Sequence, residues 1–329
     1  MTLDVLSGLE EVPPAEWEAL QAAQARPSPF LSPRFLLPWR RAFGEGCEVR
    51  VARMAPPSGP ADALLFLCRC GEGGWTFLGG EQVADYLDAL VAPGREEAFW
   101  REFLSRGLTA LGGGPLRLPG LVEGTPALSV VPRLCAEAGI PFRLEEMDRA
   151  PWIGLPGSFE AYVERLGKKE RHELRRKMRR AAELLPGLSF RVTRTAEELS
   201  RDLPSFLDLH RRSHPEKERF MDERMSAFFR EVAERFLPCG GLRLAFLSFE
   251  GGDAASVFQF RAGRSLLLYN SGYDPAHRAA NPGLVLIARC IEDAVAEGAP
   301  EYDFLRGTER YKYDLGGVDR VVHLLTVSP

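Results

Sequence analysis

The stretch from Tyr269 to Gly316 constrains the fold of this chain more than any other segment. An apolar run over residues 265–270 leads into a Ser-Gly-Tyr-Asp-Pro turn, because Gly takes positive φ and Pro stops a strand. The Asn-Pro-Gly sequence at 281–283 then starts a helix, since Asn can cap free amides and Pro is tolerated in the first turn. Gly298 ends the helix, and residues 302–305 form a short strand. This order predicts a parallel or V-shaped strand pair with a ligand site at the strand ends.

Length and element order predict two domains. At 329 residues, two domains are favoured over one, and we place them at residues 1–150 and 151–329. The element order β-α-β-β-β-α-β-α-β occurs once, loosely, in the first segment, and a similar order follows in the second. The predicted fold class is therefore α/β, with two copies of one α/β unit.

Composition excludes several classes of protein. A net charge of −4 argues against a protein built mainly to hold nucleic acid. No apolar run reaches the roughly 20 residues that a membrane-spanning helix needs. The N-terminus has no basic region before an apolar core, so we expect no signal peptide and a cytoplasmic protein.

The cysteines and histidines predict no metal site. None of the cysteines forms a zinc-type double pair, and no HExxH motif occurs. We therefore expect all six cysteines to be reduced, most of them buried: Cys47, Cys68, Cys70, Cys135, Cys239 and Cys290.

A strongly basic helix is predicted over about 168–185. From Glu164 to Arg180 it carries nine Lys or Arg and three Glu. Apolar residues at helical spacing, such as Leu174 and Met178, show that one face packs on the protein. The other face could contact RNA phosphates or an anionic polymer, or it could be a solvated face with internal Glu–Arg and Glu–Lys pairs.

The order of motifs resembles a known family. SGYDP at 271–275, NPGL at 281–284 and EGAPEYDFLRGTERYKYDLG at 297–316 are similar to the acetyltransferase family named after CelD-type cellulose-biosynthesis proteins. That family is a branch of the GNAT superfamily and is related to FemAB-like aminoacyl transferases. The resemblance covers about 152–326 and implies tandem GNAT-like domains with mixed central sheets flanked by helices. It implies an acyl-donor site in 151–329 and a degenerate, acceptor-side domain in 1–150.

The resemblance assigns the start of the helix at 282 to coenzyme A. In GNAT enzymes a glycine-rich turn there exposes amides to the pyrophosphate, and Arg278 and Gly283 fit the usual spacing. Asn281 replaces the first Gly and tolerates positive φ, whereas Pro282 departs from the pattern because it has no amide hydrogen. We expect Arg278, Asn281, Gly283 and Leu284 to hold acyl-CoA, without a metal. The alternative is an ordinary capped helix.

The polar segment after the second strand carries the expected chemistry. Tyr311 falls where the GNAT leaving-group acid usually lies, and Asp303 or Glu309 could take the proton of an amine. Arg306 and Lys312 could hold acceptor charge. The alternative is a solvated charged loop in which Asp303 caps a turn.

Two further segments complete the expected acceptor site. The turn that contains Tyr273 and Asp274 should lie at the same sheet end as Arg278, although Asp-Pro is also common in plain turns. The resemblance places Asp85 and Tyr86 near an acceptor groove between the domains, where the residues alone predict only a helix start.

Three functions follow as hypotheses. The first is an acyltransferase that moves an acyl group from acyl-CoA to an amine or hydroxyl, with a small-molecule, peptide or glycan-precursor acceptor. The second is a FemAB-like transferase that draws on aminoacyl-tRNA docked through the basic helix at 165–180. The third is a non-catalytic GNAT-like scaffold, suggested by Pro282.

Overall fold

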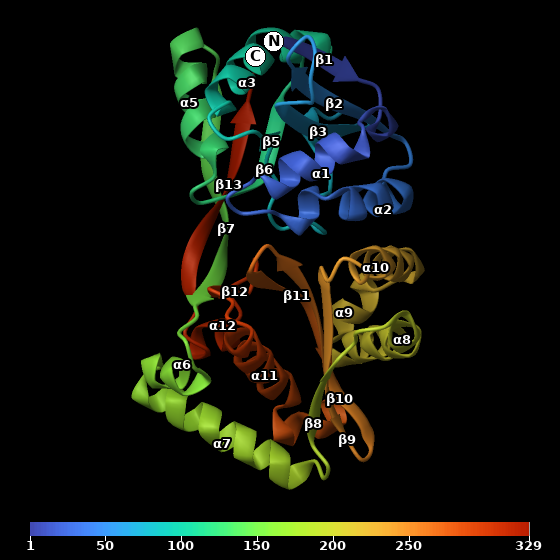
Figure 1. The fold of residues 1–329 in the computed structure, drawn as a ribbon, viewed down its shortest axis with the longest axis vertical. Helices are drawn as coiled ribbons and strands as arrows, with labels where there is room; N and C mark the ends of the chain where they lie inside the picture. Colours follow the sequence, from blue (N-terminus) through green and yellow to red (C-terminus); the bar gives the residue numbers. More distant parts are fainter. Residues whose placement is uncertain (329) are drawn as a thin grey trace. The chain divides into compact units, whose positions relative to one another are not determined.

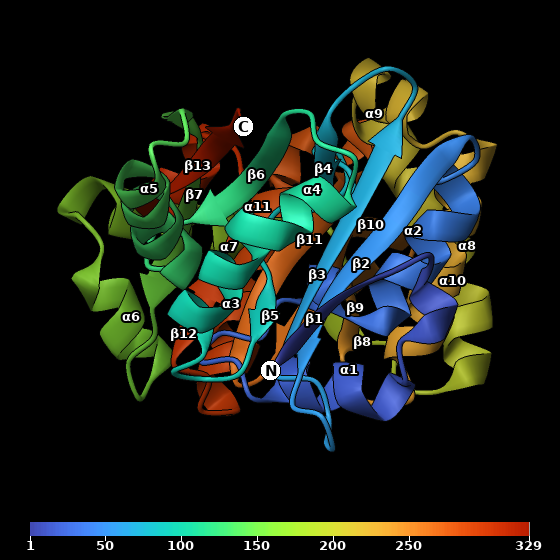
Figure 2. The same ribbon diagram turned by 90° about the horizontal axis from the view of Figure 1, so that it is seen from above.

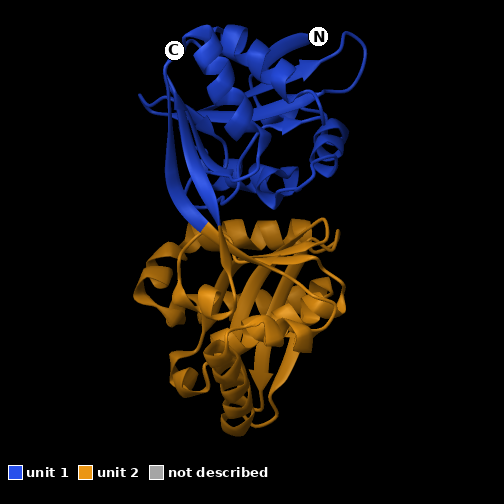
Figure 3. Ribbon diagram, turned by 90° about the vertical axis from the view of Figure 1, so that its left-hand side faces the viewer, with its two compact units in different colours: residues 1–149, 320–329 blue, residues 150–319 orange. Residues whose placement is uncertain are grey.

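A computed structural model describes residues 1–328 and divides the chain into two compact units (Figure 3). Unit 1 consists of two segments, Met1–Arg149 and the residues from Arg320 onward. Unit 2 is Ala150–Asp319. Both boundaries fall inside strands, β7 (Phe142–Gly154) and β13 (Val318–Val327). No helix within residues 1–328 is long and apolar enough to cross a membrane.

Unit 1 is a mostly antiparallel sheet with helices packed on it. Its strand order is β1-β2-β3-β4-β6-β13, with β5 paired to β3, and the β4–β6 pair is parallel. Strands β2 and β3 lie side by side as a long antiparallel pair (Figure 2). The elements before β7 are β1 Thr2–Leu6, α1 Pro14–Ala22, α2 Pro33–Phe43, β2 Cys47–Ala55, β3 Ala63–Cys70, β4 Trp75–Phe77, β5 Leu90–Val91, α3 Glu96–Glu102, α4 Leu108–Ala110, β6 Leu116–Val122 and α5 Pro126–Ala138.

Unit 2 repeats this plan. Its strand order is β7-β12-β11-β10-β9-β8, antiparallel throughout except for the parallel β11–β12 pair. Its elements between β7 and β13 are α6 Phe159–Arg165, α7 Lys168–Leu184, β8 Ser189–Val192, α8 Ala196–Ser213, α9 Pro215–Phe220, α10 Glu223–Phe236, β9 Leu242–Phe249, β10 Gly252–Ala262, β11 Ser265–Tyr273, α11 Pro282–Ala296, β12 Glu301–Asp303 and α12 Arg310–Asp314.

Helices cover both faces of the unit 2 sheet (Figure 1). Helix α8 packs on β10 and β11, and α10 packs on α8, whereas α11 lies on the opposite face with α7 against it. The α11 side holds a hydrophobic core, in which the apolar stripe that the sequence predicts, Ile287, Ala288 and Ile291, is buried. The predicted α/β class is confirmed, and the basic helix is α7.

Strand pairing continues past local break signals in two places. Residues 152–154 pair with β12, so β7 runs as far as Gly154. Strand β6 runs from Leu116 to Val122 through its pairing with β13. Cross-strand partners distant in sequence set these ends, and no local pattern contains them.

The expectation that all six cysteines are reduced was wrong. Cys47 and Cys70 form a disulfide, since they stand opposite each other at the ends of the antiparallel β2–β3 pair with 4.3 Å between their Cα atoms. Cys68 and Cys290 are buried free thiols, and burial raises the pKa of Cys68 to about 11. The two strands were predicted, but their register was not.

Candidate functional site

The parallel strands β11 and β12 separate soon after they meet. They pair only at Leu266–Tyr302 and Leu267–Asp303, whereas β11 continues to Tyr273 alongside β10. Helix α11 starts after β11, so its N-terminus belongs to the same end of the sheet as the separating strands. The predicted V-shaped pair is present, and the unpaired end of β11 leaves backbone groups open to a ligand.

The chain takes a strained turn directly after β12. Leu305 has a left-handed backbone with φ +55°, which is uncommon for a residue other than Gly. Asp303 is 3% exposed, and its Oδ1 accepts the amide hydrogen of Leu305 at 2.8 Å. The carboxylate that the sequence offered as a base is therefore engaged in holding this turn.

Lys312 fixes the other side of the same turn. Its ammonium is 2% exposed and donates to the carbonyl oxygens of Leu305, Arg306 and Gly307 at 3.2, 2.6 and 3.1 Å. It also lies 3.0 Å from a carboxylate oxygen of Glu309, a side chain that is mostly exposed. The geometry directs Lys312 toward the loop itself, so an acceptor-binding role for it stays a prediction.

Tyr311 packs on the core of unit 2 beside Phe304. Burial, with a smaller contribution from the Glu309 carboxylate, raises the pKa of Tyr311 well above its ordinary value. Within residues 1–328 its hydroxyl has no hydrogen-bond partner, and the phenol is protonated at neutral pH. A protonated hydroxyl without a partner can donate to a ligand.

The start of α11 keeps its backbone amides open. Asn281 has a left-handed backbone with φ +51°, as expected, but its side chain makes no capping hydrogen bond. The amides of Gly283 and Leu284 belong to the first helical turn, which has no acceptor within the helix. Arg278 is exposed in the short 3-10 helix that precedes α11. Together with the helix dipole, these groups favour an anion here.

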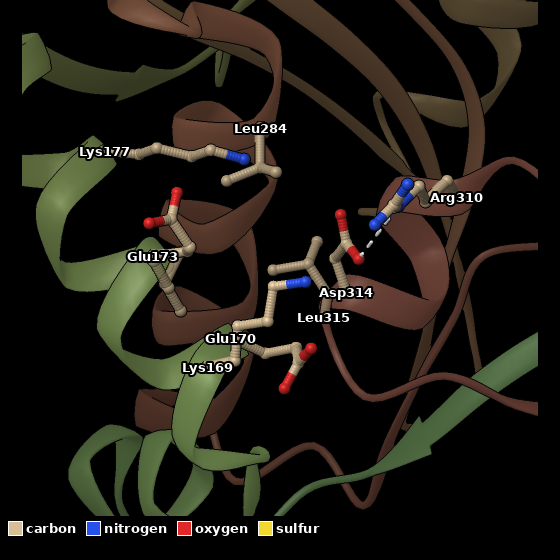
Figure 4. A pocket seen from close by; sticks show the side chains of 9 residues that line it. Lys169, Glu170, Glu173, Lys177, Leu284, Arg310, Asp314 and Leu315 are labelled. Atoms are coloured by element: carbon tan, nitrogen blue, oxygen red, sulfur yellow. Dashed lines mark ion pairs between the residues drawn. The ribbon is translucent and has the colours of Figure 1, made fainter.

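A pocket of about 270 Å³ lies next to this helix start (Figure 4). Side chains from α7, from the first turn of α11 and from α12 surround it. Two lysines, Lys169 and Lys177, form no ion pair in the described part of the chain, whereas Glu173 and Asp314 are engaged by Arg176 and Arg310. The lining residues are Lys169, Glu170, Glu173, Leu174, Lys177, Leu284, Arg310, Asp314 and Leu315.

The part that α7 plays in this pocket was not predicted. The basic face was expected to point outward, but one face of the helix lines the pocket beside Leu284. Lys169, Glu173 and Lys177 recur every four residues and so share one face of a helix. That spacing was the available signal.

The turn after β11 is tied to α8. The Asp274 carboxylate accepts the amide hydrogen of Ala276 at 2.9 Å and pairs with Arg212 at 2.7 Å. Tyr273 packs on the α11 side of the core, near Gly283. Both predicted residues thus lie at the α11 end of the sheet, with Asp274 acting as a cap for the turn.

Asp85 and Tyr86 lie in unit 1, between β4 and β5. The Tyr86 carbonyl accepts a hydrogen bond from the Ser28 hydroxyl at 2.8 Å, and its ring contacts Phe30 edge-on. An acceptor role for this pair stays a prediction.

Two polar residues of the second half escaped the sequence argument. His210 on α8 is 1% exposed, and its Nε2 lies 3.0 Å from Oδ1 of Asn270 on β11. Lys217 on α9 places its Nζ 2.5 Å from the carbonyl oxygen of Ser271. Neither contact has a sequence signal, because each joins β11 to a helix more than fifty residues earlier.

Comparison with known proteins supports the fold. Residues 168–313 match the family model for the acetyltransferase (GNAT) domain. No curated protein sequence matches the chain significantly.

Solved structures share the fold at low sequence identity. FemX superposes with a TM-score of 0.68 at 11% identity, over 99% of this chain and 97% of FemX. A conserved protein of unknown function from Bacteroides thetaiotaomicron gives 0.66 at 15% identity, over 98% and 100%. A tandem GNAT protein from the clavulanic acid biosynthesis pathway gives 0.51 at 14% identity, over 100% and 99%. The chain therefore has the tandem GNAT fold, and its residues 168–313 carry the acetyltransferase (GNAT) domain match.

Proposed function

We propose that this protein is a GNAT-type acyltransferase that moves an acyl group from acyl-CoA to an amine or hydroxyl acceptor. The observation that carries the proposal is the early separation of β11 and β12, with the open amides of α11 at the same end of the sheet. A thioester seated along the open edge of β11 would have its phosphates at the helix start. The CelD-like branch of the superfamily is part of this proposal.

The donor phosphates would be held by one helix end and one helix face. The amides of Gly283 and Leu284 supply donors, and Asn281 sets the left-handed backbone that starts α11. Lys169 and Lys177 supply unpaired positive charge across the pocket, and Arg278 adds a further exposed cation. Pro282 has no amide hydrogen to donate, and the positive charges of Lys169 and Lys177 offset this loss.

Around the reacting centre, Tyr311 is the proposed acid. Burial keeps its phenol protonated, so the hydroxyl can donate a hydrogen bond to the departing thiolate. Asp303 and Lys312 hold the turn that places Tyr311. Acceptor recognition is proposed for Arg306, Glu309 and Tyr273 in unit 2, with Asp274 beside them and Asp85 and Tyr86 in unit 1.

Calorimetry with acetyl-CoA tests the donor site. We expect binding by the wild-type protein and a loss of about tenfold in affinity for Lys169→Glu or Lys177→Glu, because each reverses a charge beside the phosphates. Lys168→Glu makes the same charge change on an exposed residue of α7 outside the pocket, and it should change affinity much less.

Equal weakening by all three variants would mean a non-specific charge effect. The absence of wild-type binding at millimolar acetyl-CoA would remove the cofactor assignment and favour a non-catalytic scaffold.

A second candidate donor is aminoacyl-tRNA. It is supported by the fold shared with FemX and by the exposed arginines of α7, such as Arg175, Arg179 and Arg180. If it is correct, tRNA affinity should fall steeply as salt is raised from 50 to 200 mM, since phosphate contacts release counterions. Filter binding measures the tRNA affinity of wild-type protein and of Arg179→Glu over this range of salt concentrations. A weak, salt-insensitive interaction would contradict this candidate.

A further inference from the structure

Lys217 lies where β11 and β12 have separated. Its Nζ is 2.5 Å from the carbonyl oxygen of Ser271, and Ser271 follows Leu267, the last β11 residue that pairs with β12. Glu309, in the segment after β12, lies close enough to act on Lys217 electrostatically. The amine therefore faces the unpaired end of one strand and the segment that follows the other.

The strand that Lys217 contacts is distorted locally. The register of β10 against β11 shifts between Phe258 and Gln259, which leaves Tyr269 as an extra residue in β11. Such bulges are frequent beside active sites because they re-aim backbone groups and side chains. Beyond the bulge, Asn270 bonds to His210 at 3.0 Å. Helix α9, which carries Lys217, and strand β11, which carries Ser271, both pack against α8.

The amine is partly buried and has no counterion. Within residues 1–328, Lys217 forms no ion pair, and burial lowers its pKa while the more distant Glu309 raises it. His210 is the other titratable group near it, and burial, with the charges of Lys217 and Arg211, lowers the pKa of His210 to about 4. Arg211 itself bonds to Met221 and Ser226. A partly buried lysine with no carboxylate paired to it gives up its proton more readily than an exposed lysine.

The carboxylates expected to act as bases have other partners. Asp303 accepts the Leu305 amide hydrogen, and Glu309 lies against the Lys312 ammonium. We propose that Lys217 is the group that takes the proton from the acceptor nucleophile, a role that rests on the proposed acyltransferase function. It is a catalytic residue in this proposal because it touches the acceptor.

The step balances as follows for an amine acceptor. An acceptor ammonium gives one proton to the neutral Nζ of Lys217, which becomes an ammonium. The free amine attacks the thioester carbonyl, so that a C–N bond forms and the C–S bond breaks. The second proton on the acceptor nitrogen passes through the Tyr311 hydroxyl to the thiolate, which leaves as CoA thiol, and Lys217 returns its proton to solvent. The hydrogen bond to the Ser271 carbonyl orients the amine throughout.

The charge state of Lys217 can be measured directly, because the chain has only five lysines: Lys168, Lys169, Lys177, Lys217 and Lys312. Proton–carbon NMR of protein labelled at lysine Cε gives a titration for each, and Lys217→Arg assigns the signal by its disappearance. We expect Lys217 to titrate at lower pH than Lys168, its exposed counterpart. Titration of Lys217 at the ordinary lysine value of about 10.4 would overturn the proposal.

Kinetics supply the second test. Release of CoA thiol from acetyl-CoA is followed with glucosamine, putrescine and glycinamide, and the fastest of these amines is used for the pH profile. We expect Lys217→Met to lower kcat by about 10²- to 10⁴-fold and to remove the acidic limb of the profile. Lys217→Arg keeps a donor to Ser271 and a positive charge but cannot accept a proton, so it should be as slow.

Acetyl-CoA affinity and melting temperature show that the variants fold, and Lys168→Met is the matched control. Activity retained in Lys217→Arg, or a change confined to KM in Lys217→Met, would mean that Lys217 binds or positions the acceptor, and would overturn the base role. Failure of the wild-type protein to bind acetyl-CoA would overturn the proposed function and this role together. Retained binding with unchanged kcat in both variants would overturn this role alone.

Discussion

Replacing Lys312 with Met should lower the free energy of unfolding by about 3 to 4 kcal/mol and abolish the ordered turn after β12. The Lys312 ammonium donates to the carbonyl oxygens of Leu305, Arg306 and Gly307, and Met offers no donor to any of them. A buried acceptor left without a partner costs about 1 to 3 kcal/mol. The left-handed conformation of Leu305 would also lose the contact that holds it.

Urea unfolding followed by tryptophan fluorescence and circular dichroism measures this effect. Lys168→Met is the control, because it deletes the same charge from an exposed position and should stay within about 0.5 kcal/mol of wild type. Lys312→Arg keeps the charge, but its planar fork does not match three converging carbonyls, so it should restore only part of the stability. A Lys312→Met protein as stable as the control would show that the ammonium does not hold the turn.

The same substitution separates two roles for Lys312. If its role is to hold the turn, the loss of activity should accompany the loss of stability, because Tyr311 is carried by the same segment. If the ammonium contacts an acceptor, as the sequence argument expected, KM for the acceptor should rise in a variant that unfolds normally. Measuring both quantities on one preparation distinguishes these outcomes.

The fold of unit 2 was largely predictable because its main signals are local. The Asn-Pro-Gly start and Gly298 set the ends of α11, which the structure places at Pro282–Ala296. Its apolar stripe, including Ile287 and Ile291, marked the buried face correctly. Likewise, the apolar run that begins at residue 265 identified β11. Periodicity and turn chemistry are properties of neighbouring residues, so one sequence contains them.

The site was harder to predict because its contacts join distant segments. Asn281 was expected to cap α11 with its side chain, but the backbone alone makes the turn. Lys217 had no motif, since only the packing of α9 brings it to Ser271. Cys47 and Cys70 needed a strand register that no local pattern specifies. In each case the missing information was which residues become neighbours in space.

Replacing Gly272 with Ala should destabilise unit 2 by about 3 kcal/mol, through a clash between backbone and backbone. A Cβ built on Gly272 would lie 2.5 Å from Cα of His210 and 2.5 Å from the carbonyl carbon of Leu209, both in α8. No side chain can rotate away from that contact, so β11 and α8 would have to move apart. The bond between His210 and Asn270 spans the same gap and should break.

Thermal and urea unfolding measure the loss, with Gly157→Ala as the matched control. Gly157 has no heavy atom within 4 Å of the added Cβ and no left-handed backbone, so the same change should be neutral or slightly stabilising there. The NMR titration of His210 gives an independent readout. Its depressed pKa, about 4, depends chiefly on burial against β11, and it should rise toward the ordinary value of about 6.5 once the elements separate.

The sign of the pH effect follows from that shift. Because burial holds His210 neutral, the unfolded state binds a proton more readily as the pH falls below about 6.5, and the wild-type protein loses stability between about pH 6.5 and 4. In Gly272→Ala the shift shrinks, so this part of the acid sensitivity should shrink as well. If Gly272→Ala unfolded at the wild-type urea concentration at both pH 7 and pH 5, the close approach of β11 to α8 would not contribute to stability, and the rigid placement of Lys217 beside Ser271 would lose its structural basis.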